Sequence, residues 1–104
     1  MADKRSWRDL QDIFEKLLGS KNVYYQPPTN VQMKYDAIRY DLSRIDSRFA
    51  NDKRYAKMNC YDVILITKLP EPEVLDKLLE LPYTSLDRPY KSDNLYHYPI
   101  TIYY

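Results

Sequence analysis

The side chains that most often catalyse reactions or bind metals are scarce in this chain. It has one histidine, His97, and one cysteine, Cys60, and the two lie far apart in the sequence. A nucleophilic Cys–His pair would require them to meet across a sheet, beside an oxyanion hole that no motif indicates. A metal site needs several ligands at defined spacing, which the acidic residues do not supply. We interpret His97 and Cys60 as structural residues, and we expect no enzyme activity, no cofactor and no metal.

The carboxylates give no better candidate for acid–base catalysis. Five of them fall at the ends of predicted strands and in turns: Asp36, Asp41, Asp46, Asp87 and Asp93. At such positions an aspartate most often accepts hydrogen bonds from nearby backbone amides. We therefore assign none of them a catalytic role.

Glycine and tyrosine occur in unusual numbers. The single glycine, Gly19, excludes a P-loop and a dinucleotide-binding loop, because both need several glycines to let the backbone approach a phosphate. The 12 tyrosines suit strands, and they also suit protein interfaces, because each brings a large contact area at low entropic cost. The two interpretations are compatible, and both stay open at this point.

Length and charge narrow the class of protein. The 104 residues fit one domain, and 16 basic against 15 acidic residues give no long-range field that would concentrate a nucleic acid. Tyrosines beside Arg39, Arg54 and Lys91 could imitate a single-strand binding platform, but this charge balance argues against it. No apolar run approaches the roughly 20 residues of a membrane helix, and the start of the chain has no apolar leader. With a single cysteine, the chain is expected to be intracellular and to contact no membrane.

Hydrophobic spacing predicts two helices and five strands. The first helix covers 7–18, with Ser6 as its N-cap and Gly19 as its left-handed end. The second begins at the Pro-Glu repeat from Pro70 and ends before Pro82. Strands are predicted over 22–26, 36–43, 58–67, 83–88 and 95–104.

The order of these elements predicts the fold class. The series α-β-β-β-α-β-β indicates a single α+β domain, residues 1–104, in which two helices pack on one face of an antiparallel sheet. The strand over 58–67 contains Val63-Ile64-Leu65-Ile66 without a break. Such a run is typical of a central strand that is covered on both faces.

Residues 44–57 are predicted to form an extended hairpin arm. The segment is polar and long for a hairpin connection, and such connections are usually functional or disordered. It carries five basic residues, Arg44, Arg48, Lys53, Arg54 and Lys57, against Asp46 and Asp52. One interpretation is a solvated hairpin extension. The other is an arm that contacts a neighbouring subunit, with Phe49 as its apolar anchor.

The last residues, Pro99 to Tyr104, remain apolar and favour a strand. Chain ends usually fray unless they are tied down, so we expect this strand to be held by a neighbouring strand or by another subunit. Together with the tyrosines and the arm, it indicates a subunit of a protein assembly.

Several segments, spread over nearly the whole chain, form a recognisable set of structural motifs. They are the helix Trp7 to Gly19 with Asn22 to Pro28, Met33 to Tyr35, Ser43 to Asp46 through Phe49 to Asp52, Leu79 to Tyr83, Asp93 to Leu95 and Thr101 to Tyr104. Together they resemble small minor structural proteins of long-tailed bacteriophages, in the tail-terminator or tail-completion group of the head–tail joining proteins.

The resemblance implies a mechanical function. Subunits of such proteins close into a homo-oligomeric ring, typically of six, that caps the tail tube and joins it to the head connector. The location would be the head–tail junction of the virion, after synthesis in the cytoplasm of the bacterial host. A cyclic ring joins two different patches of neighbouring subunits. We expect one patch on the edge strands, at Ile100, Ile102, Tyr103 and Tyr104, with strand addition as its mode.

The resemblance also implies roles for the arm and leaves alternatives. Arg44, Arg48, Lys53, Arg54 and Lys57 would contact the tube or the next subunit, or face DNA that passes through the lumen. The nearest alternative function is a neck or connector protein, a stopper or adaptor, of the same junction. More remote are a small nucleic-acid-binding regulator and a small hydrolase.

Overall fold

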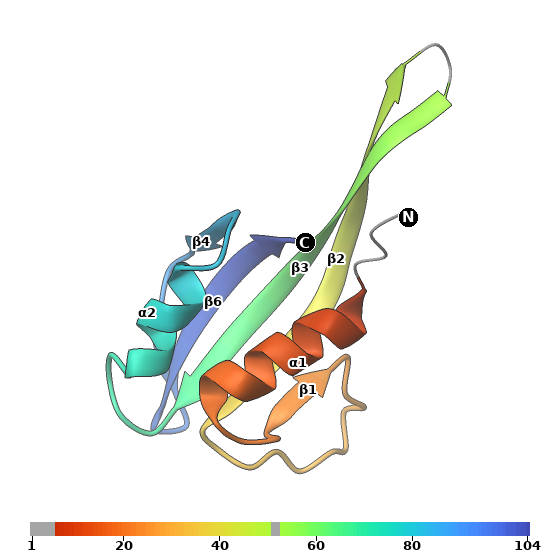
Figure 1. Cartoon of the computed structure of the whole chain (residues 1–104). Helices are drawn as coiled ribbons and strands as arrows, with labels where there is room; N and C mark the ends of the chain where they lie inside the picture. The colour runs from red at the N-terminus through yellow and green to blue at the C-terminus, as the bar shows by residue number, and fades with distance from the viewer. Residues whose placement is uncertain (1–5, 51–52) are drawn as a thin grey trace.

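The computed structural model describes the backbone of residues 6–50 and 53–104, and the side chains of residues 6–45 and 59–104. Helices α1 and α2 cover one face of a six-stranded sheet (Figure 1). The predicted α+β class, with two helices on one face, is therefore confirmed. In chain order the elements are α1 (Trp7–Leu18), β1 (Val23–Tyr25), β2 (Ala37–Ala50), β3 (Lys53–Thr67), α2 (Glu73–Leu79), β4 (Thr84–Leu86), β5 (Tyr90–Ser92) and β6 (Leu95–Tyr103).

Helix α1 begins and ends where the sequence predicts. The backbone N–H of Arg8 donates to the Ser6 hydroxyl, and the N–H of Ser6 donates to the Asp9 carboxylate at 3.2 Å. This reciprocal capping satisfies two of the N–H groups that a helix start leaves without partners. At the other end, Gly19 takes a φ of 78° and its N–H donates to the carbonyl of Glu15.

Replacing Gly19 by alanine should lower the free energy of unfolding by about 1 kcal/mol, because a Cβ is strained in the left-handed region. No atom of the surrounding structure lies within 4 Å of a Cβ added here, so the cost comes from the backbone alone. Gly19→Asn is the matched control and should lose less, because asparagine tolerates this conformation. Urea denaturation measures both, and equal losses in the two variants would contradict the explanation.

The strand order is β1-β2-β3-β6-β4, with β5 pairing to the start of β6. Three details differ from the predicted sheet. Strand β1 runs parallel to β2, with Val23 opposite Ile38, so the sheet is mixed. Strand β5 adds a sixth strand. Strand β6 lies inside the sheet, between β3 on one side and β4 and β5 on the other, because both neighbours pair with it.

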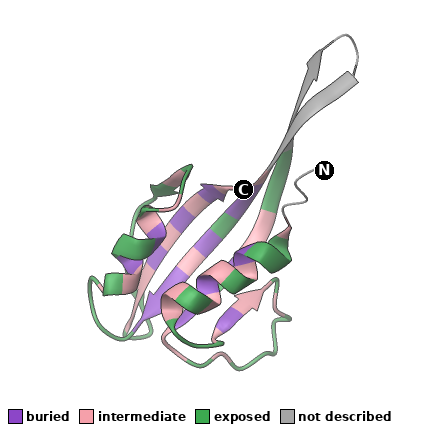
Figure 2. Ribbon diagram, viewed as in Figure 1, coloured by how far each residue is buried: buried purple, intermediate pink, exposed green. Residues whose placement is uncertain are grey.

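The core lies between the helices and the sheet face that they cover. Leu10 and Phe14 of α1 and Leu75 and Leu78 of α2 are buried against alternate residues of the three central strands. Figure 2 shows this alternation as buried and less buried bands along the strands. The sheet residues of the core are Val23 of β1 and, on the central strands, Ile38, Tyr40, Tyr61, Val63, Leu65, Tyr98, Ile100 and Ile102.

The opposite face of the sheet carries no helix of the described chain. Cys60 and Ile66, which point to this face near the two ends of the predicted strand 58–67, are buried, whereas Asp62 between them is exposed. The prediction that both faces of this strand are covered is therefore wrong at its middle. A sheet with helices on one face leaves the other face to polar and half-buried side chains.

Strands β2 and β3 continue as a two-stranded ribbon beyond the body of the sheet. Strand β1 pairs with β2 only as far as Tyr40, and the chain end pairs with β3 only from Asn59 onward. The two strands still pair with each other as far as Ala50 and Lys53. Figure 1 shows this ribbon projecting from the body, and the longest dimension of the molecule, 51 Å, is twice the other two, 25 and 24 Å.

Candidate functional site

Cys60 and His97 do not come together. Along β3 and β6, Cys60 lies opposite Tyr103, whereas His97 lies opposite Ile66. These two pairs are six positions apart along β3, which corresponds to about 20 Å. A Cys–His nucleophilic pair would need hydrogen-bond contact, so this pair does not form.

His97 has a structural environment of its own. Its ring stacks on Tyr90 with the centroids 4.6 Å apart and the planes 11° apart. Its Nδ1 lies 3.0 Å from the backbone carbonyl oxygen of Leu95. The side chain therefore joins β5 to β6. Across residues 6–45 and 59–104, no three side chains of His, Cys, Asp or Glu gather in a way that could hold a metal.

The tyrosines nearest α1 form an aromatic cluster in the core. Tyr40 packs edge-on against Phe14 at 5.1 Å and lies 4.8 Å from Tyr25, which in turn stacks on Trp7 at 4.8 Å. The Tyr40 hydroxyl lies 2.9 Å from the carbonyl oxygen of Trp7 and 2.8 Å from the Gln11 Oε1, so it ties β2 to α1. For these residues, strand and core packing accounts for the tyrosine content.

Tyr61 also belongs to this cluster, with its ring edge-on to Tyr25 and Tyr40, and burial raises the pKa of all three tyrosines. Removal from water is the largest cause for Tyr40, Tyr61 and Tyr25, because it disfavours the charged phenolate. The negative charges that neighbouring phenols would carry add to the effect on the pKa of Tyr40 and Tyr61. The cluster consequently resists ionisation, which suits a packed core and not a tyrosine that transfers protons.

The chain end is held by its own neighbours. Ile100 and Ile102 are 3% and 2% exposed, and β6 has strands on both sides. The prediction that these residues form an edge for strand addition is therefore wrong, because their backbone groups and side chains are already engaged. Tyr104 exchanges two backbone hydrogen bonds with Asn59, at 2.8 and 3.2 Å.

The predicted arm residues divide into those whose side chains are described and those that lie outside the description. Arg44 is described: it donates a hydrogen bond to the Tyr103 hydroxyl, and its guanidinium lies 5.5 Å from the centre of that ring. On the backbone, Phe49 is the partner of Arg54. The side chains outside the described residues are Arg48, Phe49, Lys53, Arg54 and Lys57.

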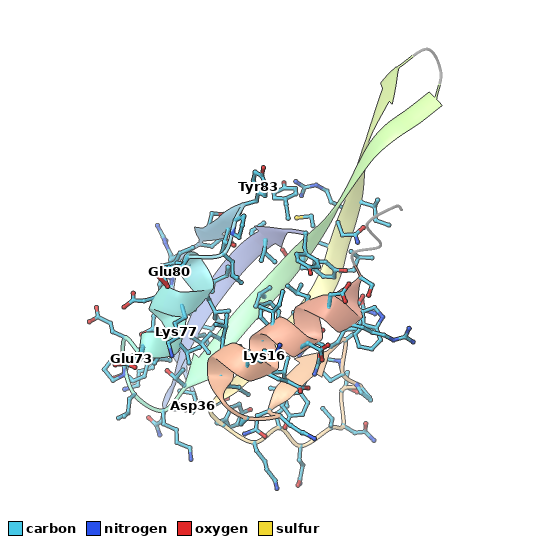
Figure 3. The ribbon with its side chains drawn as sticks, in the orientation of Figure 1. Lys16, Asp36, Glu73, Lys77, Glu80 and Tyr83 are labelled. Carbon is cyan, nitrogen blue, oxygen red and sulfur yellow. The ribbon has the colours of Figure 1, made fainter. Side chains whose placement is uncertain are left out.

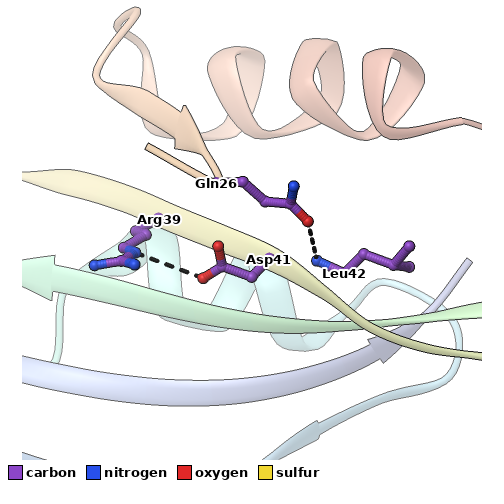
Figure 4. Close-up of polar contacts among 4 residues, drawn as sticks. All are labelled: Gln26, Arg39, Asp41 and Leu42. Carbon is purple, nitrogen blue, oxygen red and sulfur yellow. Dashed lines mark hydrogen bonds and ion pairs between the residues drawn. The ribbon is translucent and has the colours of Figure 1, made fainter. Parts of the chain in front are cut away.

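Directly after β1 ends, the side chain of Gln26 bonds to β2 in place of a further strand residue. The N–H of Leu42 donates to the side-chain oxygen of Gln26 at 3.2 Å, next to an ion pair between Arg39 and Asp41 at 3.5 Å (Figure 4). Beyond Leu42, no strand of the described chain pairs with this edge of β2. An unpaired edge of this kind is a template for contact with another chain.

An apolar groove lies where α1, the segment after α2 and the end of β6 meet. Its volume is about 180 Å³. Tyr83 stands at its border, 72% exposed and with a φ of 57°, and its carbonyl accepts from the N–H of Tyr103. The lining residues are Leu10, Ile13, Leu81, Pro82, Tyr83, Ile102, Tyr103 and Tyr104.

The groove was not predicted from the sequence, although Tyr103 and Tyr104 were predicted as interface residues and do line it. One feature of the sequence could have indicated the groove. Leu81 continues the apolar residues of α2 two positions past its end at Leu79, and Pro82 follows directly. An apolar side chain placed just beyond a helix end often contacts the turn before it.

The body and the arm carry opposite charge. Residues 44–57 hold five basic and two acidic residues, a net charge of +3. Because the whole chain has a net charge of +1, the remaining residues together carry −2. Asp9 and Glu80, which adjoin the groove residues Leu10 and Leu81 in sequence, are both exposed.

No protein-family model matches this chain, and no curated protein matches its sequence. In the part of the chain that the structure describes, neither helix has the length and apolar character needed to cross a membrane.

Proposed function

We propose that this chain is a structural protein of a long-tailed bacteriophage virion, the tail terminator that closes into a six-fold ring at the head–tail junction. The ring caps the tail tube and offers a surface to the head connector. The sequence resemblance of the α1 region, the arm and the chain end suggests this family, and the confirmed α+β class agrees with it.

The projecting arm is the observation that carries the proposal. Its described backbone pairs with nothing except the other strand of the same ribbon. A two-stranded hairpin is marginally stable by itself in water. An arm with both edges open and a net charge of +3 is therefore suited to order against another subunit, which is a property of assembly proteins.

The arm and the groove supply the two different patches that a closed ring requires. Cyclic assemblies are built from head-to-tail contacts, in which one patch of each subunit meets another patch of the next. Both patches lie at the end of the molecule where β2 and β3 leave the sheet, close to Tyr103, Tyr104 and Arg44.

The proposal is tested with the purified protein and tail tubes of the phage that encodes it. We expect the protein to bind one end of each tube and to stop further addition of tube subunits, as seen by negative-stain electron microscopy. Binding along the tube wall, or no binding, would contradict a terminator. Salt-dependent retention of the free protein on DNA would instead favour a nucleic-acid-binding regulator.

A further inference from the structure

Cys60 is buried although it points to the sheet face that the helices leave uncovered. Its side chain is 1% exposed, whereas Asp62, the next residue of β3 on the same face, is exposed. Alternate residues of a strand point to one face, so both side chains project from the same surface. The burial of Cys60 therefore requires a local cause.

Arg44 and Tyr103 are the neighbours of Cys60 on this face. Arg44 is the partner of Cys60 on β2, and Tyr103 is its partner on β6. Residues opposite each other in an antiparallel pair point to the same face, and neighbouring strands lie about 4.8 Å apart. The two backbone positions that flank Cys60 are thus roughly 10 Å apart.

The side chains of Arg44 and Tyr103 meet across this distance. The guanidinium of Arg44 donates a hydrogen bond to the Tyr103 hydroxyl, and it lies 5.5 Å from the centre of the Tyr103 ring. To reach that ring from β2, the arginine side chain has to cross β3 at the level of Cys60. The contact therefore forms a bridge above the thiol.

The next level of the same face lacks such a bridge. The neighbours of Asp62 are Asp41 on β2 and Thr101 on β6. Asp41 pairs with Arg39 of its own strand at 3.5 Å, and the Thr101 hydroxyl donates to Asp87, just after β4, at 3.0 Å. Neither of these two contacts crosses β3, and Asp62 is exposed. The comparison links the burial of the cysteine to the bridge above it.

The bridge lies where the arm leaves the body of the molecule. The register of β2 shifts between Leu42 and Arg44, and from there on its described backbone pairs only with β3. Tyr103, by contrast, is fixed to the body, because its backbone N–H donates to the carbonyl of Tyr83. Figure 3 labels Tyr83 near this end of the sheet and Asp36 near the other end. The bridge thus connects the base of the arm to a fixed strand.

We propose that Arg44 and Tyr103 form a strap across the uncovered face of the sheet, which holds the base of the arm against the body and shields the thiol of Cys60. One hydrogen bond and one cation–π contact join the two side chains, so the strap can open locally while the core stays folded. Opening releases the base of the arm and makes the thiol accessible. This device goes beyond the proposed function and does not depend on it.

The rate at which N-ethylmaleimide modifies Cys60 in the folded protein tests the strap. Cys60 is the only cysteine of the chain, so mass spectrometry of the product reports on this thiol alone. We expect Arg44→Ala to raise the rate by about 10-fold, because both contacts of the strap are lost. Tyr103→Phe keeps the ring and loses only the hydroxyl, so it should raise the rate less, by about 3-fold.

Arg39→Ala is the matched control, because it removes an arginine from the same strand and face. The partner of Arg39 is Asp41, so the thiol of Cys60 should react within about two-fold of its rate in the unmodified protein. Urea denaturation of each variant measures global unfolding, which would also expose the cysteine. The rate for Arg44→Ala should rise by more than its change in unfolding free energy accounts for. An unchanged rate, an equal rise in Arg39→Ala, or a rise explained by global unfolding alone would each overturn the strap.

Discussion

Phe14→Ala should lower the free energy of unfolding by about 4 kcal/mol, the loss typical of removing a phenylalanine side chain from a packed core. Phe14 is 1% exposed and meets the ring of Tyr40 edge-on at 5.1 Å. Small domains are stable by about 5–15 kcal/mol, so this variant should be close to its unfolding threshold at room temperature. Urea denaturation followed by circular dichroism measures the change.

The matched control is Leu69→Ala, at a leucine that is 71% exposed. Its free energy of unfolding should change by no more than about 0.5 kcal/mol. If Phe14→Ala cost less than about 1 kcal/mol, the packing of α1 on the sheet would not be as described.

Stability should fall steeply at alkaline pH, and Tyr40 should be a main cause. Its pKa in the folded protein is raised above the ordinary value of 10.0, chiefly by burial. In the unfolded chain, Tyr40 loses its proton near that ordinary value, whereas in the folded protein it keeps the proton. The contribution of Tyr40 is thus fully present below pH 10.0 and is lost as the pH rises toward the raised pKa.

The expected slope is about 1.4 kcal/mol of unfolding free energy per pH unit for each such tyrosine. Tyr40→Phe cannot ionise, so its loss above pH 10.0 should be shallower by about this amount. At neutral pH the same variant should lose about 1 kcal/mol, because its hydrogen bonds to Trp7 and Gln11 are absent. Parallel pH profiles for the two proteins would contradict the burial of Tyr40.

Helix α1 could be predicted closely because three signals agree there: apolar spacing, the Ser6 cap and the single glycine, Gly19. The face of β2 that the helices cover could also be predicted, because apolar and polar residues alternate along this strand. The parallel direction of β1 could not be predicted, because side-chain alternation over three residues carries no information about strand direction. That direction is set by the chain path between β1 and β2.

Strand β5 was missed because it is short and fully exposed, so no hydrophobic pattern marks it. Its turn did carry a signal. Asp93 and Asn94 both have positive φ, 53° and 63°, as a two-residue hairpin turn requires, and both residue types tolerate it. Reading this pair as a turn would have predicted the hairpin from Tyr90–Ser92 to β6.

The inner position of β6 and the groove depend on tertiary structure. An apolar strand such as Ile100 to Ile102 looks the same in sequence whether its partner is β4 or another subunit. The groove combines residues from α1, the segment after α2 and the chain end, which are distant in sequence. The clear alternation of apolar and polar residues was predicted only over 36–43, so the strand was not extended into the predicted hairpin arm, whereas β2 continues to Ala50.

The central claim, a ring subunit at the head–tail junction, is tested most directly by cryo-electron microscopy of the virion or of purified tails. The account predicts a ring of this protein at the head-proximal end of the tube. Density between the ring and the head, away from the tube, would indicate a connector. Absence of the protein from mature particles would contradict the structural role.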